Sequence, residues 1–75
     1  MNKNLVGRAV ALCRKARECS RVELVFWLGI SPSTAYMLWR YLKEACLKGL
    51  LDGDTYKCRY VEGADKIVFE EVGSR

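Results

Sequence analysis

Residues 20–51 read SRVELVFWLGISPSTAYMLWRYLKEACLKGLL, and this stretch decides the fold. Ser20 followed by Glu23 forms a capping-box pattern, which predicts that a helix begins at Arg21 and runs to about residue 28. Gly29 predicts the end of this helix, because glycine tolerates the positive φ of a sharp helix exit. A second helix follows almost at once, so the stretch predicts a helix-turn-helix.

The second helix is predicted over about residues 32–48. Ser31 and Pro32 have the residue types favoured at the N-cap and in the first turn. Apolar residues recur at i, i+3, i+4 and i+7 and predict one buried stripe made of Ala35, Leu38, Trp39, Leu42, Ala45 and Cys46. The opposite face is polar or exposed and carries Ser33, Tyr36, Met37, Arg40, Lys43 and Glu44.

The segments on either side complete the predicted architecture. A first helix is expected over about residues 4–18, with a buried stripe of Leu5, Val6, Ala9, Leu12, Cys13 and Ala16. Val10 and Ala11 lie beside this stripe, either as part of a subunit contact or as ordinary surface residues. After Gly49 the pattern alternates, which predicts a hairpin over about residues 55–72 whose inward residues are Tyr56, Cys58, Tyr60, Ile67 and Phe69.

The chain resembles the winged helix-turn-helix DNA-binding domains of small bacterial, archaeal and viral transcription regulators. The resemblance covers roughly residues 20–72 and rests on Leu28-Gly29-Ile30-Ser31, Ser33-Thr34-Ala35, Leu38, Leu42 and Lys48-Gly49-Leu50-Leu51. It implies an α+β, mainly α fold, in which three helices are followed by a two-stranded β-hairpin wing. Residues 1–75 would form a single domain, which is consistent with their number.

Positive charge is concentrated in the N-terminal part of the chain. Residues 1–22 hold six basic residues and one acidic residue, a balance of +5. Residues 23–48 hold three and two, or +1, and residues 49–75 hold four and six, or −2. A polyanionic partner would therefore meet the helical half, although surface helices also need charge simply for solubility.

These features predict a sequence-specific double-stranded DNA-binding protein, a transcription regulator whose helix over residues 32–48 enters the major groove. Arg40 could pair with guanine O6 and N7, whereas Tyr36 and Met37 could meet a thymine methyl group or sugar edges. Phosphate contacts are expected from the residues Arg21, Ser31, Ser33, Thr34, Lys43, Lys57 and Arg59, with Lys66 as a further candidate. A homodimer is expected, because one small module makes few contacts and two half-sites add their affinity.

The expected wing differs from a basic wing at its tip, where Glu62 and Asp65 would repel phosphate. Tyr36, Met37 and Tyr41 also fit a patch for a protein partner, since aromatic residues and methionine are enriched in such interfaces. A winged-helix interaction module in a replication or transcription assembly is therefore the alternative function. Salt dependence separates the two, because only DNA binding releases counterions.

The four cysteines, Cys13, Cys19, Cys46 and Cys58, are expected to be buried free thiols. Their spacings include no C-x-x-C pair and the chain has no histidine, so neither zinc nor any other cofactor is expected. One disulfide is the alternative if the source is a hyperthermophile.

No catalytic motif is present, so the chain is not expected to be an enzyme. It has no apolar run of membrane-spanning length and no signal-peptide pattern. We therefore expect a cytoplasmic protein, in the host cytoplasm if it is viral, with no membrane partner and no small-molecule effector.

Overall fold

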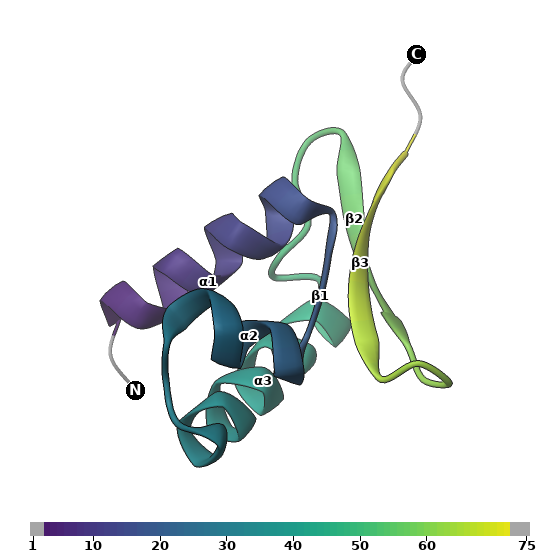
Figure 1. Ribbon diagram of the computed structural model, residues 1–75. Coiled ribbons are helices and arrows are strands. Elements are labelled where there is room, and N and C mark those ends of the chain that lie inside the picture. Colours follow the sequence, from purple (N-terminus) through teal and green to yellow (C-terminus); the bar gives the residue numbers. More distant parts are fainter. Residues whose placement is uncertain (1–2, 73–75) are drawn as a thin grey trace.

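The computed structural model describes residues 3–72 of the 75-residue chain. Within these residues the fold is a small α+β arrangement that is mainly helical, with three helices and a three-stranded antiparallel sheet (Figure 1). The elements in chain order are α1 Lys3–Ala16, β1 Glu18–Ser20, α2 Arg21–Leu28, α3 Pro32–Leu47, β2 Tyr56–Val61 and β3 Lys66–Glu71.

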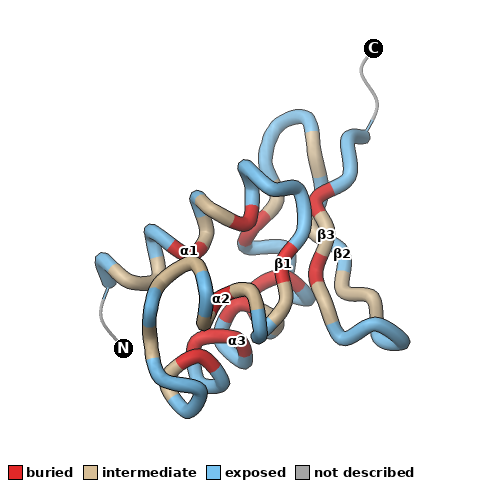
Figure 2. The backbone as a smooth tube through the Cα atoms, in the orientation of Figure 1, coloured by how far each residue is buried: buried red, intermediate tan, exposed pale blue. Residues whose placement is uncertain are grey.

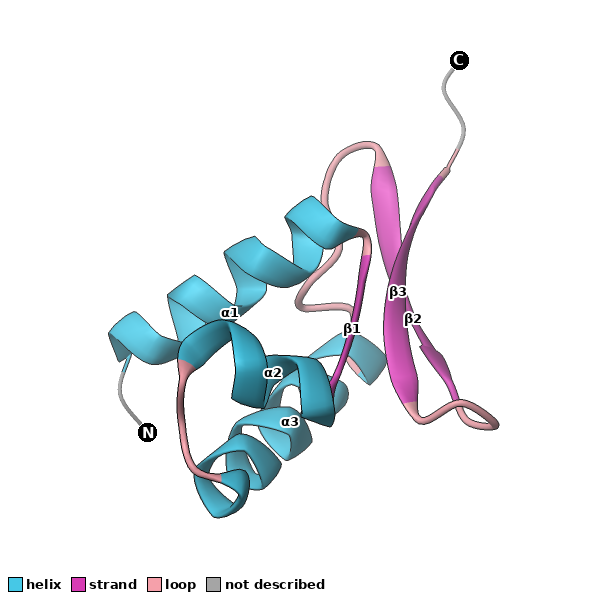
Figure 3. Cartoon of the chain, in the orientation of Figure 1, coloured by secondary structure: helices cyan, strands magenta, loops and turns pink. Residues whose placement is uncertain are grey.

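The sheet has the order β1-β3-β2, so the hairpin of β2 and β3 is extended by a third strand (Figure 3). In the register of the added strand, Glu18 lies opposite Val68 and Ser20 lies opposite Lys66. The predicted hairpin is therefore present as β2 and β3, but the third strand was not predicted. A strand of three residues is too short to show an alternating pattern, and it forms only because β3 is present to accept it.

The first helix ends earlier than the expected residue 18. Helix α1 stops at Ala16, because Arg17 turns to the left-handed backbone conformation with φ 72°. The Arg17 carbonyl then accepts a 2.9 Å hydrogen bond from the Phe69 amide of β3. This bond draws the chain onto the sheet, so Glu18 belongs to β1 rather than to the helix.

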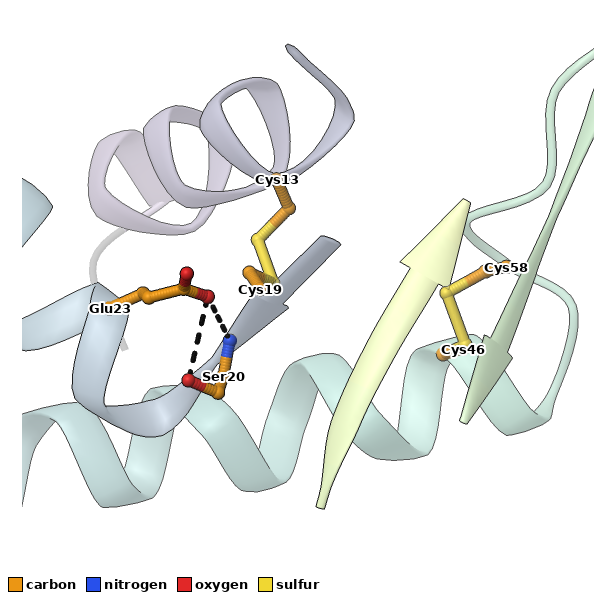
Figure 4. The surroundings of a disulfide bond; sticks show 6 residues. All are labelled: Cys13, Cys19, Ser20, Glu23, Cys46 and Cys58. Atoms are coloured by element: carbon orange, nitrogen blue, oxygen red, sulfur yellow. Dashed lines mark hydrogen bonds between the residues drawn. A yellow bond between two sulfur atoms is a disulfide. The ribbon is translucent and has the colours of Figure 1, made fainter. Parts of the chain in front are cut away.

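The capping signals around α2 and α3 are confirmed. The Glu23 carboxylate accepts a 2.9 Å hydrogen bond from the Ser20 amide at the start of α2 (Figure 4). Gly29 has φ 61° and ψ 37°, the left-handed exit expected of it. Ser31 Oγ accepts a hydrogen bond from the Thr34 amide at 3.2 Å, and Pro32 opens α3. These local contacts explain why the predicted bounds of α2 agree with the structure and those of α3 agree within one residue.

One core joins the helices to the inner face of the sheet, and the buried positions gather where these elements face one another (Figure 2). The six predicted stripe residues of α3 are all buried. On α1 only Ala9 and Cys13 are fully buried, and Ala16 is exposed because the helix ends there. Ile67 and Phe69 are buried from the sheet side, as predicted.

All four cysteines form disulfides, so the expectation of free thiols was wrong (Figure 4). Cys13 of α1 is bonded to Cys19 of β1, and Cys46 of α3 is bonded to Cys58 of β2. Their Cα atoms are 5.2 and 5.4 Å apart, within the usual range for a disulfide. Each bond ties one outer strand of the sheet to a helix. Burial itself was predicted correctly for Cys13, Cys19 and Cys46, whereas Cys58 is half-buried. Apolar spacing cannot reveal which sulfur atoms the fold brings together.

Candidate nucleic-acid interface

The outward face of α3 is the most distinctive surface among the residues predicted to bind DNA. Tyr36 and Met37 are 50% and 57% exposed, and Ser33 and Arg40 are exposed with them. Leu38 lies on the other side of the helix and is fully buried. The division into an inward and an outward face therefore agrees with the predicted one, and it leaves an uncovered helix face of mixed aromatic and cationic character.

Arg40 lies over the ring of Tyr36, with its guanidinium carbon 5.8 Å from the ring centroid. The two residues are one helical turn apart, which is the spacing that brings side chains on one helix together. Arg40 makes no ion pair with any carboxylate among residues 3–72. The guanidinium is therefore supported by an aromatic ring while its hydrogen-bond donors remain available.

Lys43 connects the outward face of α3 to the hairpin. Its ammonium nitrogen lies 4.8 Å from the ring centroid of Tyr60 on β2. The Tyr60 hydroxyl in turn donates a 2.6 Å hydrogen bond to the carboxylate of Asp65, and this bond raises the pKa of Tyr60. From the sequence, Tyr60 was predicted only to lie on the inward face of a strand. The cross-element contact to Lys43 had no signal in the sequence, because it depends on how α3 packs on β2.

The hydroxyl groups at the leading end of α3 are partly occupied by one another. Ser31 Oγ accepts from the Thr34 amide and donates to Thr34 Oγ1 at 3.0 Å. The Ser31 and Ser33 oxygens are 3.4 Å apart. Ser31 and Ser33 are exposed and Thr34 is half-buried, so the cluster is accessible, but Ser31 also caps the helix.

The sheet presents its cations in a different way. Lys57 and Arg59 alternate with Cys58 and Tyr60 and therefore lie on the face of the sheet away from α3. Arg59 forms an ion pair with Glu70 at 2.7 Å, which raises the pKa of Arg59 and lowers that of Glu70, chiefly through this hydrogen bond.

Lys66 is also paired, with Glu18 of β1. Lys57 is thus the one strand cation without an ion pair in the described part of the chain. The structure does not bring Lys57 and Arg59 onto the same surface as Arg40.

The leading end of α3 and the tip of the hairpin lie toward the same end of the molecule. The Cys46–Cys58 disulfide and the Lys43–Tyr60 contact show that α3 and β2 run in opposite directions. Moving back along α3 from Cys46 therefore leads toward the hairpin tip. The exposed Arg21 belongs to this end too, because the preceding residue, Ser20, lies opposite Lys66, which directly follows the tip.

Large apolar side chains are also exposed outside the set of residues that were predicted to contact DNA. On α3 and its exit these are Tyr41, Leu47 and Leu50, and Leu47 and Leu50 are 64% and 70% exposed. Phe26 on α2 is 78% exposed. Leu47 borders the same hollow as Arg40 and Lys43, so at this point the predicted interface meets an exposed apolar side chain. Of these four apolar residues, the sequence had indicated only Tyr41 as exposed.

Within the described chain, no group of three or more histidine, cysteine, aspartate or glutamate residues is arranged to hold a metal ion. None of the helices of residues 3–72 combines the length and the apolar character needed to cross a membrane. Comparison of the chain with protein-family models, with curated proteins and with solved structures finds no match in any of the three.

Proposed function

We propose that this chain is a winged helix-turn-helix protein that binds double-stranded DNA sequence-specifically and regulates transcription, with α3 in the major groove. The observation that carries the proposal is the uncovered outward face of α3, where Arg40 is stacked on Tyr36 with its donors free of any described carboxylate. The left-handed turn at Gly29 and the cap at Ser31 support it, since they give α2 and α3 the form of a helix-turn-helix.

Arg40 would supply the base-specific contact. A guanidinium presents two parallel donors that match guanine O6 and N7 in the major groove. Stacking on Tyr36 restricts the orientation of Arg40, so less side-chain entropy is lost when it binds. Met37 is next to this pair on the exposed face and would provide apolar contact for a thymine methyl group.

Phosphate contacts would come from the end of the molecule that holds the leading end of α3. Arg21 and Lys43 are the cations proposed for this role, with Ser31, Ser33 and Thr34 as hydroxyl donors. The hairpin would contribute less than in a basic wing, because Arg59 and Lys66 already have carboxylate partners. We retain Lys57 as its one proposed phosphate contact.

A single module of this size offers few base contacts, so we propose that it acts as a homodimer on two half-sites. Val10 packs partly against the core, whereas Ala11 is exposed. Of the two α1 residues suggested for a subunit contact, only Ala11 is therefore fully exposed to a second copy of the chain. The exposed Val22 and Phe26 of α2 offer a larger apolar area for the same purpose.

Fluorescence anisotropy with a duplex selected from a random pool would test DNA binding. We expect the affinity to fall steeply as salt increases, with log K changing by about −0.9 per log unit of salt for each phosphate contacted. We also expect the selected duplex to be bound more tightly than a scrambled duplex of the same composition. Selection of no preferred sequence, together with a flat salt dependence, would refute the proposal.

The second candidate is a protein-interaction module, and the exposed Tyr41, Leu47 and Leu50 favour it. Tyr41 and Leu50 border one shallow hollow, whereas Leu47 borders another together with Arg40 and Lys43. Exposed aromatic and apolar side chains of this kind are enriched in protein interfaces. Under this function Leu47→Ser with Leu50→Ser would abolish partner binding and leave duplex affinity unchanged. Under the DNA-binding function, Arg40→Ala would have the larger effect on duplex affinity.

A further inference from the structure

A concave site lies at the base of the hairpin, away from its tip. The pocket has a volume of about 220 Å³ and is lined by Arg14, Arg17, Thr55, Tyr56, Phe69 and Glu71. Tyr56 begins β2 directly after Thr55, and Glu71 is the last residue of β3, so the length of the strands separates the pocket from the Glu62–Asp65 tip. The pocket is therefore distinct from the end of the molecule assigned to DNA.

The charges around this pocket favour an anion. Arg14 donates a hydrogen bond to the Leu51 carbonyl at 3.4 Å and stacks on Tyr56, 5.6 Å from the ring centroid. Neither Arg14 nor Arg17 forms an ion pair with a described carboxylate, even though Glu71 also lines the pocket. Two guanidinium groups thus face one carboxylate, and the Thr55 hydroxyl adds a neutral donor.

Arg17 is an unexpected residue at its backbone position. It ends α1 with φ 72°, in the left-handed region where glycine is usual and a residue with a Cβ atom is strained. Its side chain makes no hydrogen bond or ion pair with residues 3–72 that would compensate for this strain. A ligand held by the guanidinium gives a physical reason for an arginine at this place, and strained non-glycine residues do cluster at ligand sites.

The remaining wall of the pocket is aromatic. Tyr56 and Phe69 pack edge to face with their centroids 5.7 Å apart, and both border the pocket. The volume is below the range of about 300–1,000 Å³ that is typical of sites for whole drug-sized molecules. The pocket therefore suits one charged group with part of an attached ring rather than a complete cofactor.

We propose that this pocket binds a phosphate group, held by the guanidinium groups of Arg14 and Arg17 and the hydroxyl of Thr55. Arginine is well matched to phosphate because its planar donors form bidentate hydrogen bonds with two oxygens. The phosphate belongs either to a free nucleotide or to a nucleic-acid backbone. The proposal does not depend on α3 reading DNA, because none of the pocket residues lies on α3.

Nuclear magnetic resonance titration of the full chain with inorganic phosphate and with adenosine 5′-monophosphate tests the site. Ionic strength is held constant with sodium chloride, so that general screening is the same throughout. We expect saturable shifts of the amides of Thr55, Tyr56 and Phe69, with tighter binding of the nucleotide because its ring can reach the aromatic wall.

Arg17→Gly is the decisive variant, because it separates ligand binding from folding. Glycine removes the guanidinium and relieves the positive φ, so the melting temperature should stay equal or rise while phosphate affinity falls about tenfold. Glu71→Gln removes the opposing carboxylate and should tighten binding. Lys15→Ala removes a neighbouring cation of α1 that does not line the pocket and should leave affinity unchanged.

Duplex binding by the same variants identifies the source of the phosphate. If Arg17→Gly weakens both nucleotide and random-duplex binding, the pocket takes a backbone phosphate as well as a free one. If it weakens only nucleotide binding, the ligand is a free nucleotide, whatever the outcome for α3. Absence of saturable shifts, or equal phosphate affinity in the parent, Arg17→Gly and Lys15→Ala proteins, overturns the proposal.

Discussion

The outward face of α3 and the outward face of the sheet each present an arginine, and the two arginines differ in their partners. Arg40 stacks on Tyr36 of its own helix and has no described carboxylate partner. Arg59 is held by Glu70 at 2.7 Å, across the hairpin. A count of basic residues therefore does not show which of them are available to a polyanion. What matters is whether each charge is already neutralised by its neighbours.

The largest effect is expected from the disulfide that joins α3 to β2 on their inward sides. Cys46→Ala with Cys58→Ala removes a cross-link between residues 12 apart, which should cost about 3 kcal/mol of unfolding free energy on the chain-entropy estimate. Urea unfolding would measure it. Cys13→Ala with Cys19→Ala is the control and should cost about 2 kcal/mol, because its separation of 6 residues closes a smaller loop. Equal unfolding midpoints for the parent and both variants would contradict the estimate.

The next prediction compares the turn between α2 and α3 with the turn of the hairpin. Gly29→Val should destabilise the fold by about 2 kcal/mol, because a β-branched residue is strained at φ 61°. Gly63→Val is a matched control, since a side chain at either glycine would enter open space but only Gly29 has a positive φ. Thermal unfolding should separate the two variants. Similar melting temperatures would mean that the left-handed turn is not required.

The third prediction tests the two arginines directly. Arg40→Ala should cost about 1–3 kcal/mol of binding free energy on the preferred duplex and relax its base preference. Arg59→Ala should change duplex affinity much less, because its guanidinium is already paired. Melting temperatures should hardly change for Arg40→Ala, since the side chain points away from the core. A larger loss of binding for Arg59→Ala would reverse the comparison.

A smaller effect is expected when the arginine of the sheet is released from its partner. Glu70→Gln should leave Arg59 free to contact phosphate, so nonspecific duplex binding at low salt should tighten and its salt slope should steepen by about 0.9. Asp54→Asn removes the same charge from an exposed position before β2 that takes part in no ion pair among residues 3–72, and it serves as the control. Equal affinities for the two variants would show that release of Arg59 adds no contact.

The smallest effect is expected from the same ion pair, as a dependence of stability on pH. The hydrogen bond from Arg59 holds the pKa of Glu70 below its usual range, so the pair contributes fully above the unfolded pKa of about 4.3. The contribution is lost as the pH falls through the lower folded pKa. Melting temperatures measured from pH 2 to 6 should show the parent protein above Glu70→Gln at pH 6, with the difference shrinking toward pH 2.

Much of the helical part could be predicted because its signals are local. Gly29, Ser31 and Pro32 act on the backbone within a few residues of themselves, so α2 and α3 could be placed from the sequence. The end of α1 could not be predicted. Arg17 adopts the left-handed conformation that usually ends a helix at a glycine, and no glycine stands at this position. For the candidate site, the outward residues of α3 followed from helical spacing, whereas the contact between Lys43 and Tyr60 did not.

The sequence by itself determined the helices, the hairpin, the buried stripe of α3 and the exposure of Arg40, since periodicity and capping depend on residues close together in the chain. The tertiary structure alone decided the third strand, the partners of the four cysteines and the pairing of Arg59 with Glu70. It also brought Arg14 and Arg17 to the same pocket as Tyr56 and Phe69. Contacts of this kind depend on the relative placement of separate elements, and that placement arises only when the whole core packs.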